Sequence, residues 1–197
     1  FESNNILDFV ASIDGTTASA YWESTPVYRD PAAWYHVVVA LDTTQATSAN
    51  RLIIYVNGVV QTGTFSTTPA LNADIQFNRA AAHQLGVTNA NGLANYFDGE
   101  MAEINFVDGQ ALAPTAFGAS SIYNQWLPKK YAGTYGTNGF YLPFSGGTAT
   151  SYAGSFNGST QYLSAAANAA FTVPSSTSFT IEAWIYIPVT PSTNLRI

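Results

Sequence analysis

The sequence predicts an all-β protein built as an antiparallel sandwich of two sheets, with little helix. Short runs of alternating apolar and polar residues recur along its 197 residues, and turn residues separate them. Hydrophobic residues make up 47% of the chain, charged residues 9% and aromatic residues 14%. Aromatic and β-branched residues favour strands, and a chain of this length can bury one sizeable core.

The strands are expected in the following order along the chain. The first is expected at residues 6–14 and ends in a turn at Asp14–Gly15. The strongest strand signal is Trp34–Asp42, and a hairpin follows at Arg51–Gly63, where Asn57–Gly58 suits the positive φ angles of a tight turn. Further strands are expected around residues 101–107, 139–147, 151–164 and 178–188. One short helix is expected within residues 113–121, because Pro114 and Thr115 resemble a helix start.

Charge and composition exclude several classes of function. The net charge is −6, and the six basic residues are scattered apart from Lys129–Lys130, so no basic stripe exists to bind nucleic acid. No apolar run approaches the roughly 18 residues of a membrane-spanning helix, so membrane insertion is not expected. The absence of cysteine excludes disulfides and thiolate metal sites.

Alternation assigns an apolar face and a mixed face to each main strand. If the alternation continues without interruption through residues 101–107, the strand has two distinct faces. One face carries Ala102, Ile104 and Phe106, and the other carries Met101, Glu103, Asn105 and Val107. A sandwich needs the apolar faces for its core. The predicted core residues are Phe9, Val37, Val39, Leu41, Ile54, Val56, Ile104, Phe106, Phe179, Ile181 and Ile185.

The mixed faces supply the candidate binding residues. Aromatic rings present apolar area to the C–H face of a sugar, while amides and carboxylates pair with its hydroxyls. If a sugar binds, we expect Trp184 and Tyr186 to stack on it, and Glu103 and Asn105 to donate or accept hydrogen bonds. In the alternative reading, the tryptophans Trp34 and Trp184 are packing anchors. His36 is then a hydrogen-bonded core histidine, and Glu182 pairs with a neighbouring strand. The candidate sugar-binding residues are Trp34, His36, Glu103, Asn105, Glu182, Trp184 and Tyr186.

No cofactor is expected from any motif. His36 and His83 are isolated, so a histidine metal site is not indicated. Asp74, Asp98 and Asp108 lie in predicted loops or at strand ends and are the candidate Ca²⁺ ligands. The alternative is that these aspartates only form turns.

Four stretches together resemble the laminin-G-like, or concanavalin-A-like, jelly-roll family. They read "DPAAWYHVVVALD", "RLIIYVNGVVQTG", "YFDGEMAEINFVDGQALAPTAFG" and "GSFNGSTQYLS…SFTIEAWIYIP". The resemblance implies a jelly-roll sandwich, in which relatives sometimes hold Ca²⁺. The family places the last of these stretches first and the third at its end, so this order is permuted. The chain is therefore either a permuted domain or a window cut from a tandem array of such domains.

This resemblance divides the chain into three parts. We expect residues 1–125 to be the C-terminal portion of a laminin-G-like domain, 126–139 a linker, and 140–197 the opening strands of a second or permuted domain. The alternative for 126–139 is a long surface loop within one domain. Pairing of residues 179–187 with residues 101–107 would indicate a closed permuted sandwich.

A narrower resemblance, carried by "YRDPAAWYHVVVALDTTQATSANRLIIYVNGVVQTG" and "WLPKKYAGTYGTNGFYL", is to repeats of virion structural proteins of marine bacteriophages. It implies a non-catalytic fibre, tail or head-decoration protein at the virion surface. The expected partners are copies of itself, other virion proteins and, more specifically, a host cell-surface glycan. A bacterial extracellular adhesin or filament subunit is the alternative.

A glycoside hydrolase of the same fold is a further alternative. Such enzymes carry the pattern Glu-x-Asp-x-Glu on one strand, because hydrolysis needs two carboxyl groups in the cleft. Here the strand reads Met101-x-Glu103-x-Asn105, and alternation places Glu100 and Glu103 on opposite faces. We therefore expect no enzymatic activity.

Overall fold

The computed structural model of the chain describes residues 5–12, 18–75, 82–87, 93–144, 153–167 and 178–188. Regular structure over these residues consists of strands and two short 3-10 helices, which confirms the all-β class. The strand pairings described are antiparallel, as expected. The turn predicted at Asp14–Gly15 lies outside the described residues.

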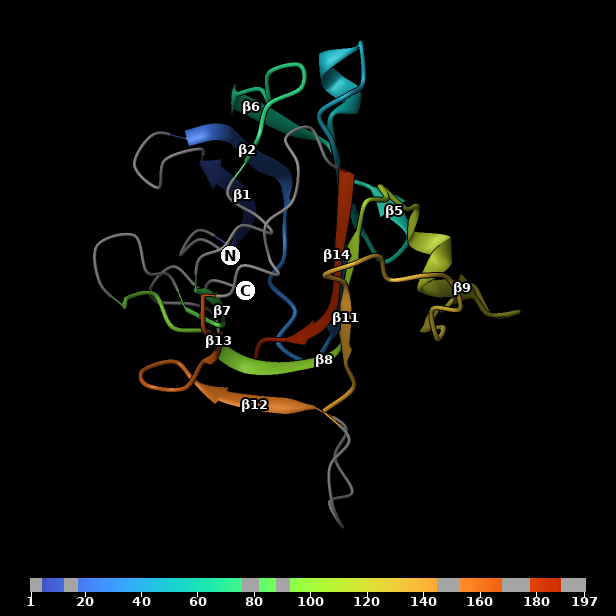
Figure 1. Cartoon of the computed structure of the whole chain (residues 1–197). Helices are drawn as coiled ribbons and strands as arrows, with labels where there is room; N and C mark the ends of the chain where they lie inside the picture. The colour runs from blue at the N-terminus through green and yellow to red at the C-terminus, as the bar shows by residue number, and fades with distance from the viewer. Residues whose placement is uncertain are drawn as a thin grey trace.

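A seven-stranded sheet forms one layer of the molecule (Figure 1). Its central strands are β8 (Asp98–Asp108), β14 (Ser178–Tyr186) and β3 (Trp34–Asp42), with β14 between the other two. On the β3 side follow β4 (Leu52–Val56) and β5 (Val59–Val60). On the other side, β11 (Phe140–Leu142) and β12 (Gly154–Asn157) both pair with β8.

A three-stranded sheet forms the second layer (Figure 1). It contains β1 (Ile6–Ser12), β2 (Ala18–Val27) and β6 (Gly63–Thr67), in the order β1-β2-β6. One apolar cluster joins residues of both sheets, among them Phe9 and Trp22 with Leu41 and Ile185. The two layers therefore form a sandwich around a shared core, consistent with a concanavalin-A-like jelly roll.

Four short strands and the two 3-10 helices lie outside these sheets. β7 (His83–Leu85) pairs with β13 (Leu163–Ala165), and β9 (Gly118–Ser120) pairs with β10 (Trp126–Pro128). The helices are η1 (Ser48–Asn50) and η2 (Pro114–Ala116). The helix expected within residues 113–121 is thus a single 3-10 turn that begins at Pro114. The later residues of this range form strand β9 instead.

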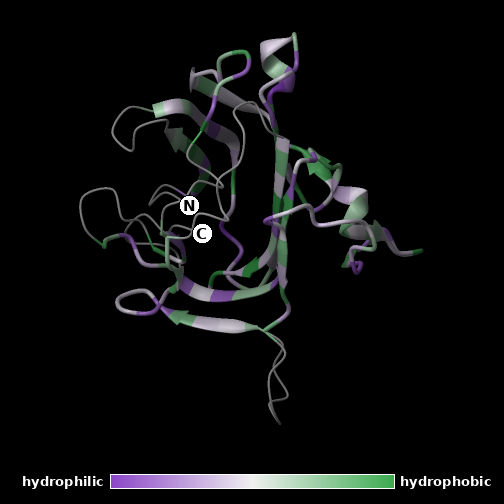
Figure 2. Ribbon diagram, viewed as in Figure 1, coloured by the Kyte–Doolittle hydropathy of each residue, from purple (hydrophilic) through white to green (hydrophobic). Residues whose placement is uncertain are grey.

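The predicted core is confirmed. All eleven residues belong to the main apolar cluster or pack against it; Val39 and Ile181 are half-buried and the others are buried. Figure 2 shows hydrophobic and hydrophilic residues alternating in bands along the long strands of the larger sheet. In β3 and β14 this alternation has the predicted phase, because both strands pair without interruption over nine residues.

The β4–β5 hairpin also has the predicted turn. Asn57 and Gly58 have φ angles of 50° and 80°, the left-handed conformation that a two-residue hairpin turn requires. The Asn57 side chain adds a second constraint, because its Oδ1 accepts a hydrogen bond from the backbone N–H of His36 at 2.9 Å. The turn is therefore tied to β3 as well as to its own hairpin.

β8 departs from the predicted alternation at a β-bulge. Ala102 lies opposite Trp184 and Asn105 lies opposite Glu182, so two residues of β8 face one residue of β14. Within the bulge, Glu103 has a φ of 54°, in the left-handed region that non-glycine residues seldom adopt.

The bulge shifts the phase of the first half of the strand. Met101 lies in the main core together with Ile104, although they are three residues apart. The sequence-based assignment of Met101 to the mixed face and of Ala102 to the core face is therefore wrong. One extra residue in a strand inverts the alternation on one side of it, and no local pattern in the sequence marks that point.

The order of strands bears on the predicted division of the chain. β14 pairs with both β3 and β8, so residues 178–186 complete the sheet that residues 34–108 begin. This is the pairing expected of a closed permuted sandwich. Residues 126–139, expected as a linker, include β10 and the buried side chain of Tyr131, and they pack on the sheet. The domain boundaries at 125 and 140 stay a prediction.

Candidate functional site

The candidate site lies on the outer face of the larger sheet, defined as the face turned away from the smaller sheet. Residues 112–135, here called the covering segment, cross part of this face (Figure 1). A second apolar cluster holds them there, in which Val38 and Val107 of the sheet meet Phe117 and Tyr131 of the covering segment. Part of the outer face is therefore buried beneath the covering segment and forms a second, smaller core.

His36 lies beneath the covering segment and is fully buried, with 0% of its surface exposed. Its Nδ1 accepts a hydrogen bond from Nε1–H of Trp126 at 2.8 Å. Because an indole can only donate, Nδ1 carries no proton, and the neutral imidazole has its proton on Nε2. Burial lowers the pKa of His36, since the charged form loses its hydration, and the Trp126 bond favours the same neutral form.

Glu182 faces the other side of the imidazole. Its Oε1 lies 2.8 Å from Nε2 of His36, which is ion-pair distance, although the N–H direction is not aligned for a hydrogen bond. Its Oε2 accepts a hydrogen bond from Nδ2 of Asn105 at 2.6 Å. Glu182 is 1% exposed, and this burial raises the pKa of its carboxyl; the Asn105 bond opposes the rise and the nearby Glu103 adds to it.

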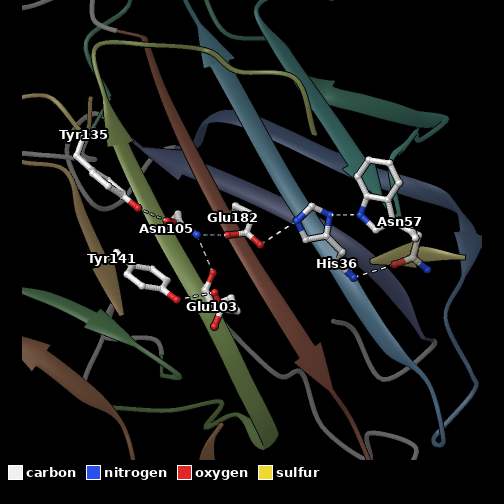
Figure 3. Close-up of polar contacts among 8 residues, drawn as sticks. His36, Asn57, Glu103, Asn105, Tyr135, Tyr141 and Glu182 are labelled. Atoms are coloured by element: carbon white, nitrogen blue, oxygen red, sulfur yellow. Dashed lines mark hydrogen bonds and ion pairs between the residues drawn. The ribbon is translucent and has the colours of Figure 1, made fainter. Parts of the chain in front are cut away.

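The network continues across β8 to the covering segment. Tyr135 donates its hydroxyl to Oδ1 of Asn105 at 2.7 Å, and Asn105 also donates to the backbone carbonyl of Glu103 at 2.9 Å. The side chain of Asn105 therefore joins Tyr135 to Glu182, with 4% of its own surface exposed. Figure 3 shows this chain of contacts running from Tyr135 through Asn105 and Glu182 to His36.

Glu103 forms a second branch of the network. Its Oε2 accepts a hydrogen bond from the hydroxyl of Tyr141 on β11 at 2.5 Å. Burial, this hydrogen bond and the carboxylate charge together raise the pKa of Tyr141, because each disfavours the phenolate. Glu103 therefore lies on the outer face near Glu182, as Figure 3 shows.

The bulge also changes the expected position of Glu100. It lies directly opposite Tyr186 on β14, and Tyr186 lies directly opposite Trp34 on β3. Residues directly opposite each other share a face, so Glu100 is on the outer face with Glu103. The expectation that Glu100 and Glu103 point to opposite faces is wrong, because the bulge at Glu103 inserts the extra residue between them.

One row of the outer face is less buried than the network. Trp34 is 36% exposed, and its ring centroid lies 5.6 Å from that of the half-buried Tyr186. Glu100 and Ser155 extend the row across β8 and β12. We call these four residues the aromatic row. It places two rings, a carboxylate and a hydroxyl side by side at one end of the sheet.

The seven predicted binding residues thus share a face but divide into two environments. His36, Asn105 and Glu182 are buried in hydrogen-bonded contacts, as the alternative structural reading expected of His36 and Glu182. Trp184 is half-buried, with its ring centroid 4.8 Å from that of His36. Contact between a sugar and these buried groups would require the covering segment to move.

Sequence reasoning missed the groups that complete the network. Trp126 and Tyr135 come from the segment expected as a linker, and Tyr141 comes from the short strand that follows it. A signal was present, since that segment is rich in aromatic residues, which solvent-exposed linkers rarely need. Its lack of alternation gave no indication of which side chains point inward.

The three aspartates proposed for Ca²⁺ do not come together. Asp98 begins β8 and Asp108 ends it, which separates them by ten residue steps, or about 33 Å at strand spacing. Asp108 Oδ2 accepts a hydrogen bond from the backbone N–H of Asn138. Within the described part of the chain, no three His, Asp or Glu side chains are grouped as metal ligands.

The described residues contain no helix of the length and apolarity that spanning a bilayer requires.

Comparison with known proteins places the chain in a family. A family model described as the concanavalin A-like lectin/glucanases superfamily matches residues 1–115, which is more than half of the 197 residues. No curated protein and no solved structure matches the chain. The superfamily includes both enzymes and non-enzymes, so the match indicates the fold of this chain and not its activity. With the two-sheet sandwich described above, this match shows that the chain belongs to the concanavalin A-like lectin/glucanase superfamily.

Proposed function

We propose that this protein is a non-catalytic binding module at a virion surface, as part of a fibre, a tail or a head decoration. Its partners are copies of itself and other virion proteins, and its ligand is a host cell-surface glycan. The virion setting rests on the sequence resemblance. The observation that supports the binding role is the aromatic row, in which Trp34 is 36% exposed while His36 and Glu182 of the same face are buried.

Two of the carboxylates on the outer face, Glu103 and Glu182, are engaged in contacts within the protein, which supports a non-catalytic role. Glycoside hydrolysis needs two carboxyl groups that reach the glycosidic bond from both sides. Glu182 is 1% exposed, with one oxygen against His36 and the other bonded to Asn105. Glu103 is bonded to Tyr141. Both groups are thus engaged in contacts that hold the sheet and its cover together.

The aromatic row suits a sugar for a different reason. Trp34 and Tyr186 stand on neighbouring strands with their ring planes inclined by 33°, which offers an apolar surface wider than one ring. Glu100, directly opposite Tyr186, supplies an acceptor for hydroxyl groups at the edge of that surface. This arrangement can hold the C–H face of a sugar while it hydrogen-bonds the ring substituents.

A glycan array tests the ligand. We expect the intact protein to bind a defined set of glycans, and Trp34→Ala to weaken that binding at least tenfold, about 1.4 kcal/mol. Tyr123→Ala is the matched control, because Tyr123 is an exposed aromatic residue in the turn between β9 and β10, outside the aromatic row. Equal losses in both variants would contradict the aromatic row as the binding surface, and no binding by the intact protein would remove the glycan from the proposal.

Two further measurements test the setting and the chemistry. Immunogold labelling with antibodies against the chain should decorate virus particles; labelling of bacterial cell surfaces alone would favour the adhesin or filament alternative. Release of reducing sugar from polysaccharides by the purified protein, lost in Glu103→Gln, would contradict the non-catalytic role.

A further inference from the structure

Trp126 anchors the β9–β10 hairpin (residues 118–128) on the outer face. Its ring lies against Gly58 and Gly118 so closely that an added Cβ at either glycine would overlap it. Its only polar atom donates to Nδ1 of His36 at 2.8 Å, and the two rings lie 5.8 Å apart. Since the indole cannot accept, this bond exists only while Nδ1 is unprotonated.

We propose that His36 is an acid-operated latch for the β9–β10 hairpin. A proton from solvent added at Nδ1 turns the acceptor into a donor, so two N–H groups face each other and the bond to Trp126 is lost. The hairpin then leaves the sheet, and the imidazolium gains contact with water. The outer face beneath it, with His36 and Glu182, becomes accessible.

The groups that face His36 do not stabilise its charged form in place. Glu182 on β14 is the nearest titratable group, but burial raises the pKa of its carboxyl, so in acid it supplies no negative charge. The turn after β4 presents the uncharged amide of Asn57, and β10 presents the uncharged indole of Trp126. The other titratable groups of the same network are Glu103, Tyr135 and Tyr141.

The release is confined to the hairpin by the second apolar cluster. Phe117 precedes the hairpin and Tyr131 follows it, and both are buried against Val38 and Val107 of the sheet. These contacts involve no titrating histidine. Acid therefore opens residues 118–128 first and leaves the sandwich folded.

Fluorine NMR of the chain labelled with 5-fluorotryptophan measures this directly. The protein has four tryptophans, and Trp126→Phe assigns the resonance of Trp126. Between pH 7.5 and pH 3.5, we expect the Trp126 resonance to move with a midpoint below the ordinary histidine pKa of about 6.5. The resonance of Trp22, in the main core, should stay in place over the same change.

His36→Asn is the matched variant, because its amide oxygen takes the place of Nδ1 as acceptor and does not titrate. In this variant the Trp126 resonance should stay in place through the pH range in which it moves in the unmodified chain. The latch is refuted if all four resonances move together in one transition, or if His36→Asn leaves the Trp126 transition unchanged. If that variant does not fold, the comparison of Trp126 with Trp22 in the unmodified chain decides alone.

Discussion

Replacement of Glu182 by glutamine tests the electrostatics of the buried network. Burial raises the pKa of this carboxyl in the folded protein, while in the unfolded chain it returns to the ordinary glutamate value of about 4.3. Between these two pKa values the folded form holds a proton that the unfolded form has lost. The stability linked to Glu182 is therefore fully present below the unfolded pKa, and it is lost as pH rises through the folded pKa.

The size of the effect follows from one proton. Linkage gives a fall in unfolding free energy of about 1.4 kcal/mol for each pH unit in that window. His36 has the opposite slope, because its pKa is lowered by burial and its penalty appears as pH falls below about 6.5. Measurements between pH 6.5 and pH 8.5 avoid that contribution, and over two units the expected loss reaches about 2.7 kcal/mol.

Urea unfolding at pH 6.5, 7.5 and 8.5 provides the assay. The difference in unfolding free energy between the natural chain and Glu182→Gln should shrink by about 1.4 kcal/mol per pH unit, because glutamine does not titrate. Glu100→Gln is the control, since it makes the same change on the same face outside the buried network. A difference that stays constant from pH 6.5 to pH 8.5 would show that Glu182 is ionised in the folded protein and would refute the reasoning.

Three further changes test the packing and the turn. Gly118→Ala should destabilise the protein by about 1–3 kcal/mol in urea unfolding, because the added Cβ meets the ring of Trp126, whereas Ser120→Ala on the same strand should change stability by less than about 0.5 kcal/mol. Met101→Ala should cost about 2–5 kcal/mol, since the bulge turns this side chain into the core; a loss below about 0.5 kcal/mol would return it to the mixed face. Asn57→Ala should lower the melting temperature and Asn57→Gly should restore most of it, because the turn needs a positive φ; equal losses would assign the effect to the side-chain bond with β3 instead.

The fold and most of the core were predictable from the sequence for local reasons. Side chains point to alternate faces wherever a strand is extended. The apolar positions in the sequences of β3 and β14 therefore indicated directly which residues face the core. The Asn57–Gly58 pair likewise indicated a tight turn, because both residue types adopt the positive φ angles that such a turn requires. Both signals depend only on residues that are close together in the sequence.

The candidate site was predictable only in part. The seven proposed residues do lie on one face, because alternation placed those of β3 and β14 correctly. Their burial depends on the covering segment, whose aromatic residues have no periodic pattern. Trp126 reaches His36 across 90 residues of chain, and Asn105 reaches Glu182 across 77.

The sequence by itself determined the class of fold, the core faces of the uninterrupted strands and the hairpin turn. The tertiary structure alone decided the bulge at Glu103, the burial of the His36–Glu182 pair and the separation of the aspartates along β8. The physical reason is the range of the interactions. Backbone geometry sets alternation residue by residue, whereas a bulge and a cover depend on which distant strand or segment packs against a face.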